Sequence, residues 1–95
     1  MKVLLVGCGS IADVFHLPAW DKVDGAAVCA ICDINEGHAT EIAEKYGIRK
    51  VYVDYNEALD CEKPDIVDIC TPHGMHYGQT MLALNAGSHV IVEKP

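Results

Sequence analysis

Short runs rich in valine and isoleucine alternate with longer amphipathic segments along this 95-residue chain. Five runs are expected to form strands, and the four segments between them are expected to form helices. Strands that are apolar on both faces and linked by helices require a parallel sheet covered on both sides. The sequence therefore predicts one doubly wound α/β domain over residues 1–95, with strand order 3-2-1-4-5. The expected strands are 2–6, 26–32, 50–53, 66–70 and 89–93.

The helices are predicted from apolar spacing and from their end signals. Their expected ranges are about 10–23, 36–46, 56–61 and 74–86. Pro18 should kink or divide the first helix, because proline lacks a donor N–H. Asn35 is the expected N-cap of the second helix, and Gly47 is its expected stop.

Net charge and hydropathy argue against two classes of partner. Seven basic side chains against 14 acidic ones give a formal charge of −7, which repels nucleic acid phosphates and anionic membrane surfaces. No apolar run approaches the roughly 20 residues that a membrane span needs. The N-terminal residues lack the long apolar region and cleavage site of a secretion signal. We therefore expect a cytoplasmic protein without a nucleic acid or membrane partner.

Cysteine and histidine spacing predicts no metal or redox site. Five cysteines, an odd number without a secretion signal, are expected to be thiols. Cys29 and Cys32 form a C-x-x-C pair, but residues three apart in a strand should face opposite sides of the sheet. His73 and His76 have helical spacing without a third ligand beside them, and the other three histidines are expected at surface or packing positions. Asp68 interrupts an apolar strand for no reason visible in the sequence.

A glycine-rich turn follows the first expected strand. It reads G-C-G-S-I-A and matches G-x-G-x-x-A between a strand and a helix. Gly7 permits the tight turn, Gly9 lets the backbone approach a pyrophosphate, and Ala12 lets the helix pack closely. The amides of Ser10 and Ile11 would then point at the phosphates. The alternative is an ordinary tight connection between strand and helix.

The second expected strand ends at Asp33, a little over twenty residues after the glycines. An acidic side chain there can accept hydrogen bonds from both hydroxyls of an adenosine ribose. It would also repel a 2′-phosphate, and no Arg or Lys follows directly to accommodate one. The sequence therefore favours NAD over NADP, and the alternative role for Asp33 is that of a helix N-cap.

The fourth and fifth strands also end at candidate site residues. Thr71 and Pro72 follow the fourth strand, so a turn and a helix start again face the expected pocket. The fifth strand ends in Glu93-Lys94-Pro95. Lys94 would lie beside the nicotinamide end of a dinucleotide, where its ammonium can steer a substrate hydroxyl or donate a proton. The alternative is a charged strand end followed by a turn.

Together these motifs resemble those of the glucose-fructose oxidoreductase, inositol dehydrogenase and rhizopine catabolism family, called Gfo/Idh/MocA. The similarity covers the whole chain, and the final E-K-P is its most specific element. It implies a Rossmann domain that binds NAD or NADP, with Lys94 in a catalytic position near nicotinamide and substrate. The Thr-Pro turn would border the cofactor, and His76 and Glu93 match cofactor-binding positions. His73 departs from the asparagine common in the family.

The resemblance also implies an activity for the parent protein. Family enzymes transfer a hydride between a nicotinamide cofactor and a sugar, polyol or related hydroxy compound, with a second domain supplying most of the substrate pocket. That domain and a sixth strand are absent from these residues, so we expect cofactor binding without turnover, and self-association through an exposed strand edge. Two alternatives are a non-catalytic dinucleotide-sensing or regulatory module and a methyltransferase that binds S-adenosylmethionine. Ala12 and the E-K-P argue against the latter.

Overall fold

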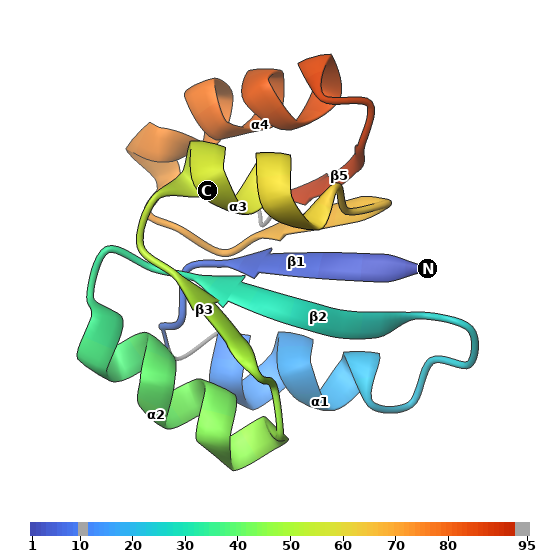
Figure 1. The fold of residues 1–95 in the computed structure, drawn as a ribbon, viewed down its shortest axis with the longest axis vertical. Coiled ribbons are helices and arrows are strands. Elements are labelled where there is room, and N and C mark those ends of the chain that lie inside the picture. Colours follow the sequence, from blue (N-terminus) through green and yellow to red (C-terminus); the bar gives the residue numbers. More distant parts are fainter. Residues whose placement is uncertain (10–11, 93–95) are drawn as a thin grey trace.

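Five parallel strands form one sheet in the order β3-β2-β1-β4-β5, as the sequence predicts (Figure 1). The computed structural model describes residues 1–9 and 12–92. The strands are β1 (Lys2–Val6), β2 (Ala27–Cys32), β3 (Lys50–Tyr52), β4 (Ile66–Ile69) and β5 (His89–Val92). The predictions that fall outside the described residues concern Ser10, Ile11, Glu93, Lys94 and Pro95.

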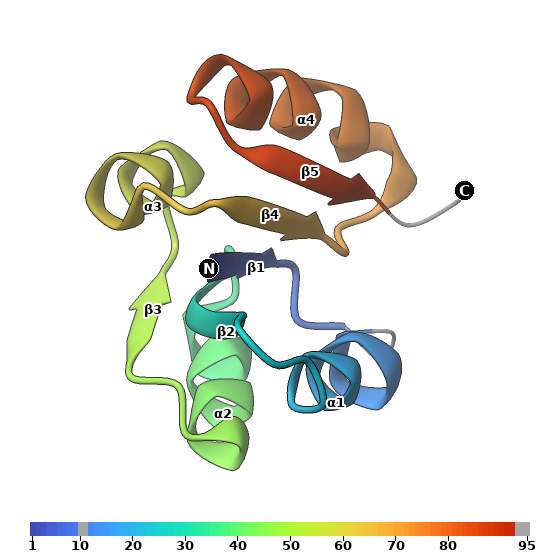
Figure 2. The ribbon, with the colours of Figure 1, turned by 90° about the vertical axis from the view of Figure 1, so that its right-hand side faces the viewer.

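Helices cover both faces of the sheet (Figures 1 and 2). They are η1 (Ala12–His16), α1 (Leu17–Trp20), α2 (Glu36–Tyr46), α3 (Tyr55–Glu62), η2 (His73–Met75) and α4 (His76–Asn85). Leu4 belongs to the buried cluster shared with α3 and α4, whereas its neighbour Leu5 belongs to the cluster shared with η1, α1 and α2. β1 is therefore buried on both faces, as a central parallel strand should be. In the described part of the chain, no helix combines the length and apolar character needed to cross a membrane.

The ends of α2 confirm both predicted signals. Asn35 caps the helix, since its side-chain oxygen accepts a hydrogen bond from the amide of His38 at 3.0 Å. Gly47 ends it with a left-handed φ of +71°. The third helix extends one residue beyond its predicted range at each end, and the fourth begins as the single 3-10 turn η2.

The first helix is shorter than predicted and is divided. A π-helical turn, η1, is followed by the four-residue α1, which ends three residues before the predicted Val23. Pro18 occupies the first turn of α1, where a residue without an N–H is tolerated, and the π-helical pattern changes to α-helical between His16 and Leu17. The chain then leaves through turns, with the amide of Val23 donating to the carbonyl of Trp20.

A β-bulge in β2 overturns one prediction about the cysteines. Val3 pairs with Val28 while Leu4 pairs with Ala30, so Cys29 is an extra residue without a partner in β1. The bulge interrupts the alternation of side chains, and Cys29 packs against the same cluster that contains Cys32. The prediction that the two thiols face opposite sides is therefore wrong. Cys29 and Cys32 are both free thiols.

A buried carboxylate joins α3 to the neighbouring strands. Only 2% of the Glu62 side chain is exposed, and its oxygens lie 3.3 Å from the Lys50 ammonium and 3.7 Å from that of Lys2. The Tyr52 hydroxyl donates a further hydrogen bond. Burial opposes ionisation, but the hydrogen bonds from Tyr52, Cys29 and Lys50 outweigh it and hold the pKa of Glu62 below its ordinary value.

We expect the free energy of unfolding to decrease as the pH falls through the pKa of Glu62. A carboxyl whose pKa is lowered by folding contributes stability above its unfolded value of 4.5, and that contribution is lost as the pH falls toward the folded value. Glu62→Gln should cost about 1–2 kcal/mol near neutral pH and should reduce the pH dependence, as measured by urea unfolding at about pH 7 and about pH 3. Glu44→Gln, at an exposed position of α2, is the matched control. An undiminished pH dependence in Glu62→Gln would contradict the assignment.

Candidate dinucleotide-binding groove

The carboxyl ends of β1, β2 and β4 border a groove of about 540 Å³. Val6 at the end of β1 pairs with Cys32 of β2 and with Ile69 of β4, so the three strands end level. The direction of winding reverses between β1 and β4, which is where doubly wound sheets bind ligands. The groove is lined by Gly7, Cys8, Gly9, Asp33, Ile34, Asn35, His38, Cys70, Thr71, Pro72 and Met75.

Gly7 turns the chain where there is no room for a side chain. Its φ is +88°, in the left-handed region. A Cβ on Gly7 would lie 2.9 Å from both the carbonyl carbon of Cys70 and the amide nitrogen of Thr71. Gly9 differs, because no atom lies within 4 Å of the position of its Cβ. Gly7 therefore lets the turn pack directly against the backbone that follows β4, and Gly9 leaves the backbone accessible from the groove.

Asp33 links the end of β2 to the glycine turn. Its Oδ2 accepts a hydrogen bond from the amide of Cys8 at 2.8 Å, and its Oδ1 accepts one from the amide of Asn35 at 2.9 Å. Because Asn35 caps α2, the alternative in which Asp33 is the N-cap is wrong. The Asp33 carboxylate therefore connects two walls of the groove, the glycine turn and the loop that follows β2.

His76 supports the turn after β4 from behind. Thr71 and Pro72 line the groove, whereas His76 is buried outside it. Nε2 of His76 donates to the carbonyl oxygen of Thr71 at 2.6 Å, and the Thr71 hydroxyl donates to Oε1 of Gln79. His76 is thus a positioning residue that acts on the groove through Thr71.

The environment of Cys8 favours its protonated thiol. Burial, together with the carboxylate of Asp33 and the neighbouring Cys32, raises the pKa of Cys8 to about 12. A thiol with this pKa stays protonated near neutral pH, and the thiolate is the reactive form. The groove therefore offers hydrogen-bonding groups and shape from this segment rather than covalent chemistry.

The structure brings five predicted site residues into one groove: Gly7, Gly9, Asp33, Thr71 and Pro72. Their contacts with a cofactor stay predictions. Ala12 is fully buried against the α1 face of the sheet, so it sets the packing of the first helix. Sequence reasoning missed the other groove residues, among them Ile34, His38 and Met75. These residues flank the motifs, and only the course of the loops decides which of them face the groove.

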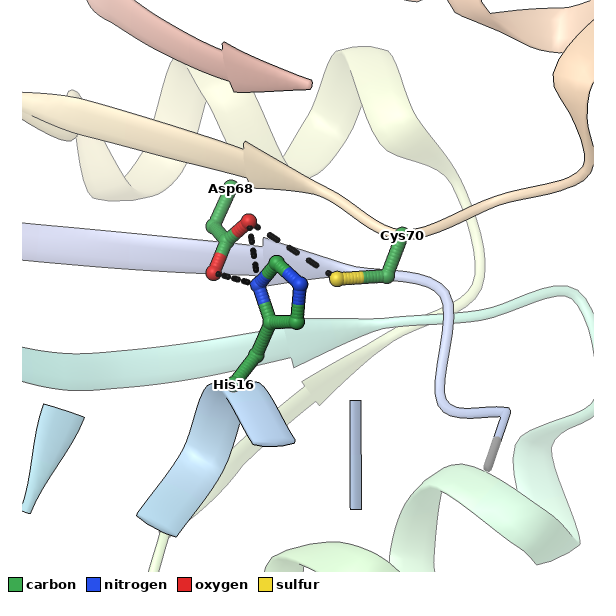
Figure 3. A group of neighbouring side chains, drawn as sticks. All are labelled: His16, Asp68 and Cys70. Atoms are coloured by element: carbon green, nitrogen blue, oxygen red, sulfur yellow. Dashed lines mark hydrogen bonds and ion pairs between the residues drawn. The ribbon is translucent and has the colours of Figure 1, made fainter. Parts of the chain in front are cut away.

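Asp68 has the structural role that the sequence did not reveal (Figure 3). Its carboxylate accepts hydrogen bonds from Nδ1 of His16, 2.8 Å from Oδ2, and from Nε1 of Trp20, also 2.8 Å from Oδ2. The thiol of Cys70 points to the same carboxylate, 3.7 Å from Oδ1. Asp68 is 1% exposed, so the first helix is tied to β4 by a buried hydrogen bond. His16 is thus more than the surface or packing residue that was expected.

Comparison with known proteins gives this groove its context. A family described as "Oxidoreductase family, NAD-binding Rossmann fold" matches residues 1–95. The chain belongs to this family, Gfo/Idh/MocA. It is 38% identical, over all 95 residues, to D-glucoside 3-dehydrogenase of Escherichia coli, of which it covers 27%.

Two solved structures of similar proteins contain ligands. Scyllo-inositol dehydrogenase from Lactobacillus casei, with bound NAD(H) and scyllo-inositol, superposes over the whole chain with a TM-score of 0.91 and 29% identity. A 3-ketoreductase from Actinomadura kijaniata, in complex with TDP-benzene and NADP, gives a TM-score of 0.90 and 32% identity. The chain covers 28% and 30% of these two proteins. It therefore corresponds to the NAD-binding Rossmann domain of Gfo/Idh/MocA proteins.

Because only Gly7 lies close to other backbone atoms, alanine substitutions at three different glycines should reduce the free energy of unfolding by different amounts. Gly7→Ala combines a positive φ with a 2.9 Å clash and should cost about 3 kcal/mol or more. Gly87 has nearly the same φ, +89°, but open space around it, so Gly87→Ala should cost only about 1–2 kcal/mol. Gly9→Ala should leave stability within about 1 kcal/mol of the parent. Urea unfolding measures all three, and equal costs for Gly7→Ala and Gly87→Ala would show that the clash is relieved cheaply.

Proposed function

We propose that this domain binds the cofactor for an oxidoreductase that transfers a hydride between a nicotinamide dinucleotide and a sugar, polyol or related hydroxy compound. The main support is the position of Asp33, whose carboxylate lies at the groove and contacts the glycine turn. A carboxylate beside a glycine turn at the switch point of a doubly wound sheet is the arrangement that binds an adenosine ribose next to its pyrophosphate. The sugar and polyol substrates named for relatives support the substrate class.

Each wall of the groove has a separate role in this proposal. The backbone from Gly9 to Ile11 would receive the pyrophosphate, because a glycine there leaves amides accessible. Asp33 would accept hydrogen bonds from the ribose hydroxyls. Thr71, held by His76, would border the cofactor toward its nicotinamide end. When bound, the nicotinamide accepts or returns the hydride, and Lys94 is proposed to orient the substrate hydroxyl or move its proton.

NAD is proposed as the preferred cofactor over NADP. The Asp33 carboxylate would repel a 2′-phosphate, and the groove residues beside it, Ile34, Asn35 and His38, include no Lys or Arg. Relatives with bound NAD(H) and with bound NADP both exist, so this preference depends on the residues of this chain. His38 is the one histidine among the described residues that line the groove.

The 95-residue chain is proposed to bind cofactor without turnover. It spans a little over a quarter of its relatives' length, and substrate contacts are proposed to come mainly from the rest of such a protein. Cytoplasmic nicotinamide dinucleotides are its proposed ligands, and nucleic acid and membranes are not proposed partners. Ile91 and Val92 of the edge strand β5 are 42% and 38% exposed, so self-association is proposed, and a monomer at high concentration in sedimentation would contradict it.

Fluorescence titration with NADH and NADPH tests the cofactor proposal. We expect saturable NADH binding and NADPH binding that is weaker by about tenfold or more, because of the charge on Asp33. Asp33→Asn keeps an oxygen to accept from Cys8 but removes the charge, so it should weaken NADH binding and bring the two affinities closer. Asp33→Ala should weaken NADH binding further.

Two controls separate loss of binding from loss of fold. Asp60→Ala removes an exposed carboxylate from α3 and should leave both affinities unchanged. Circular dichroism should show that each variant is folded. Equal NADH and NADPH affinities in the parent would contradict the preference, and a folded parent chain that binds neither dinucleotide would contradict the proposed function.

A further inference from the structure

We propose that His16, Asp68 and Cys70 form a binding site for one zinc ion, separate in function from the dinucleotide groove. Each residue offers one ligand atom, and these atoms all lie within 4.8 Å of one another. His16 comes from the end of η1, whereas Asp68 and Cys70 come from β4 and the residue after it. Figure 3 shows the imidazole, the carboxylate and the thiol pointing toward a common region.

The two distances from Asp68 to the other ligand atoms suit a tetrahedral ion. Nδ1 of His16 lies 3.0 Å from Oδ1 of Asp68, and Sγ of Cys70 lies 3.7 Å from the same oxygen. Zinc bonds of about 2.0–2.3 Å at tetrahedral angles separate ligand atoms by roughly 3–4 Å. The third pair, His16 and Cys70, has ligand atoms within 4.8 Å of each other, so these two side chains must move together to complete one coordination sphere, with water as a fourth ligand.

Trp20 provides the outer contact that such sites require. Its indole Nε1 donates to Oδ2 of Asp68 at 2.8 Å. Oδ2 is thereby held in place and also accepts from Nδ1 of His16 at 2.8 Å, whereas Oδ1 lies 3.0 Å from the same nitrogen and 3.7 Å from Sγ of Cys70. A ligating carboxylate is usually oriented by a donor to its second oxygen in this way. Asp68 is also almost completely buried, so the contact fixes its position before an ion binds.

The donor set selects the metal. A thiolate, an imidazole nitrogen and a carboxylate oxygen suit zinc, whereas magnesium and calcium require oxygen ligands. The charges of the carboxylate and thiolate balance those of a divalent ion. Binding would replace the hydrogen bond between His16 and Asp68 with bonds to the ion. The Cys70 thiol would release its proton to solvent, and His16 would carry its ring proton on Nε2 instead of Nδ1.

A bound ion would strengthen a connection that the fold already makes. It would link the end of η1 to β4 just before Thr71, and Cys70 itself lines the dinucleotide groove. Within residues 1–9 and 12–92, this is the one set of three such side chains with suitable spacing. Local spacing in the sequence could not reveal it, because 52 residues separate His16 from Asp68.

Titration of the chelator-treated chain with Co²⁺ and with Zn²⁺ tests the site. We expect about one Co²⁺ per chain, with a thiolate-to-cobalt charge-transfer band that Zn²⁺ abolishes by displacement. Cys70→Ser should remove the band and weaken Zn²⁺ binding by at least about tenfold. His16→Gln should weaken binding to a similar degree.

Cys61→Ser is the matched control, because Cys61 is an exposed free thiol outside the cluster. It should bind Co²⁺ with an unchanged band. Absence of a charge-transfer band in the folded parent chain would overturn the proposal, as would a band that persists in Cys70→Ser. Cys70 is only partly buried, so its serine variant should fold, which circular dichroism would verify.

Discussion

The approach of the first turn to the end of β4 is the constraint on which the groove depends. Gly7 donates its amide hydrogen to the carbonyl of Cys32 at 2.8 Å, and the amide of Cys70 donates to the carbonyl of Val6 at 2.7 Å. The turn is thus held between the ends of β2 and β4, where any Cβ would meet backbone atoms. The glycine turn and the turn after β4 form two walls of the groove, and both start at this junction. The width of the groove therefore depends on the absence of a side chain at Gly7.

Much of the fold could be predicted because hydrophobic period and turn residues act locally. The two ends of α2 depend on Asn35 and Gly47, whose effects extend over one helical turn. The predictions failed where the decisive contact was not local. The bulge at Cys29 arises from how β2 pairs with β1, and the first helix ends at Trp20 rather than at Val23, although its division near Pro18 was predicted.

The candidate site was also predictable only where local sequence signals determine it. Gly7 and Asp33 carry recognisable spacing, and their positions at strand ends follow from the parallel sheet. The buried link between Asp68 and His16 could not be foreseen, since pairing of a carboxylate inside an apolar strand becomes visible only once the first helix is placed. The structural role of His76 could not be predicted either. The histidine matches a recognisable motif, but its hydrogen bond to Thr71 means that it supports the groove rather than lining it.

Backbone amide chemical shifts during NADH titration test the central claim, that the dinucleotide binds where β1, β2 and β4 end. The account predicts saturable shifts for Gly7, Gly9, Asp33 and Thr71, which line the groove. The cavity near Leu59, Lys63 and Gly87 should show no change. Shifts confined to that cavity, or no shifts in a chain with a dispersed spectrum, would contradict the account.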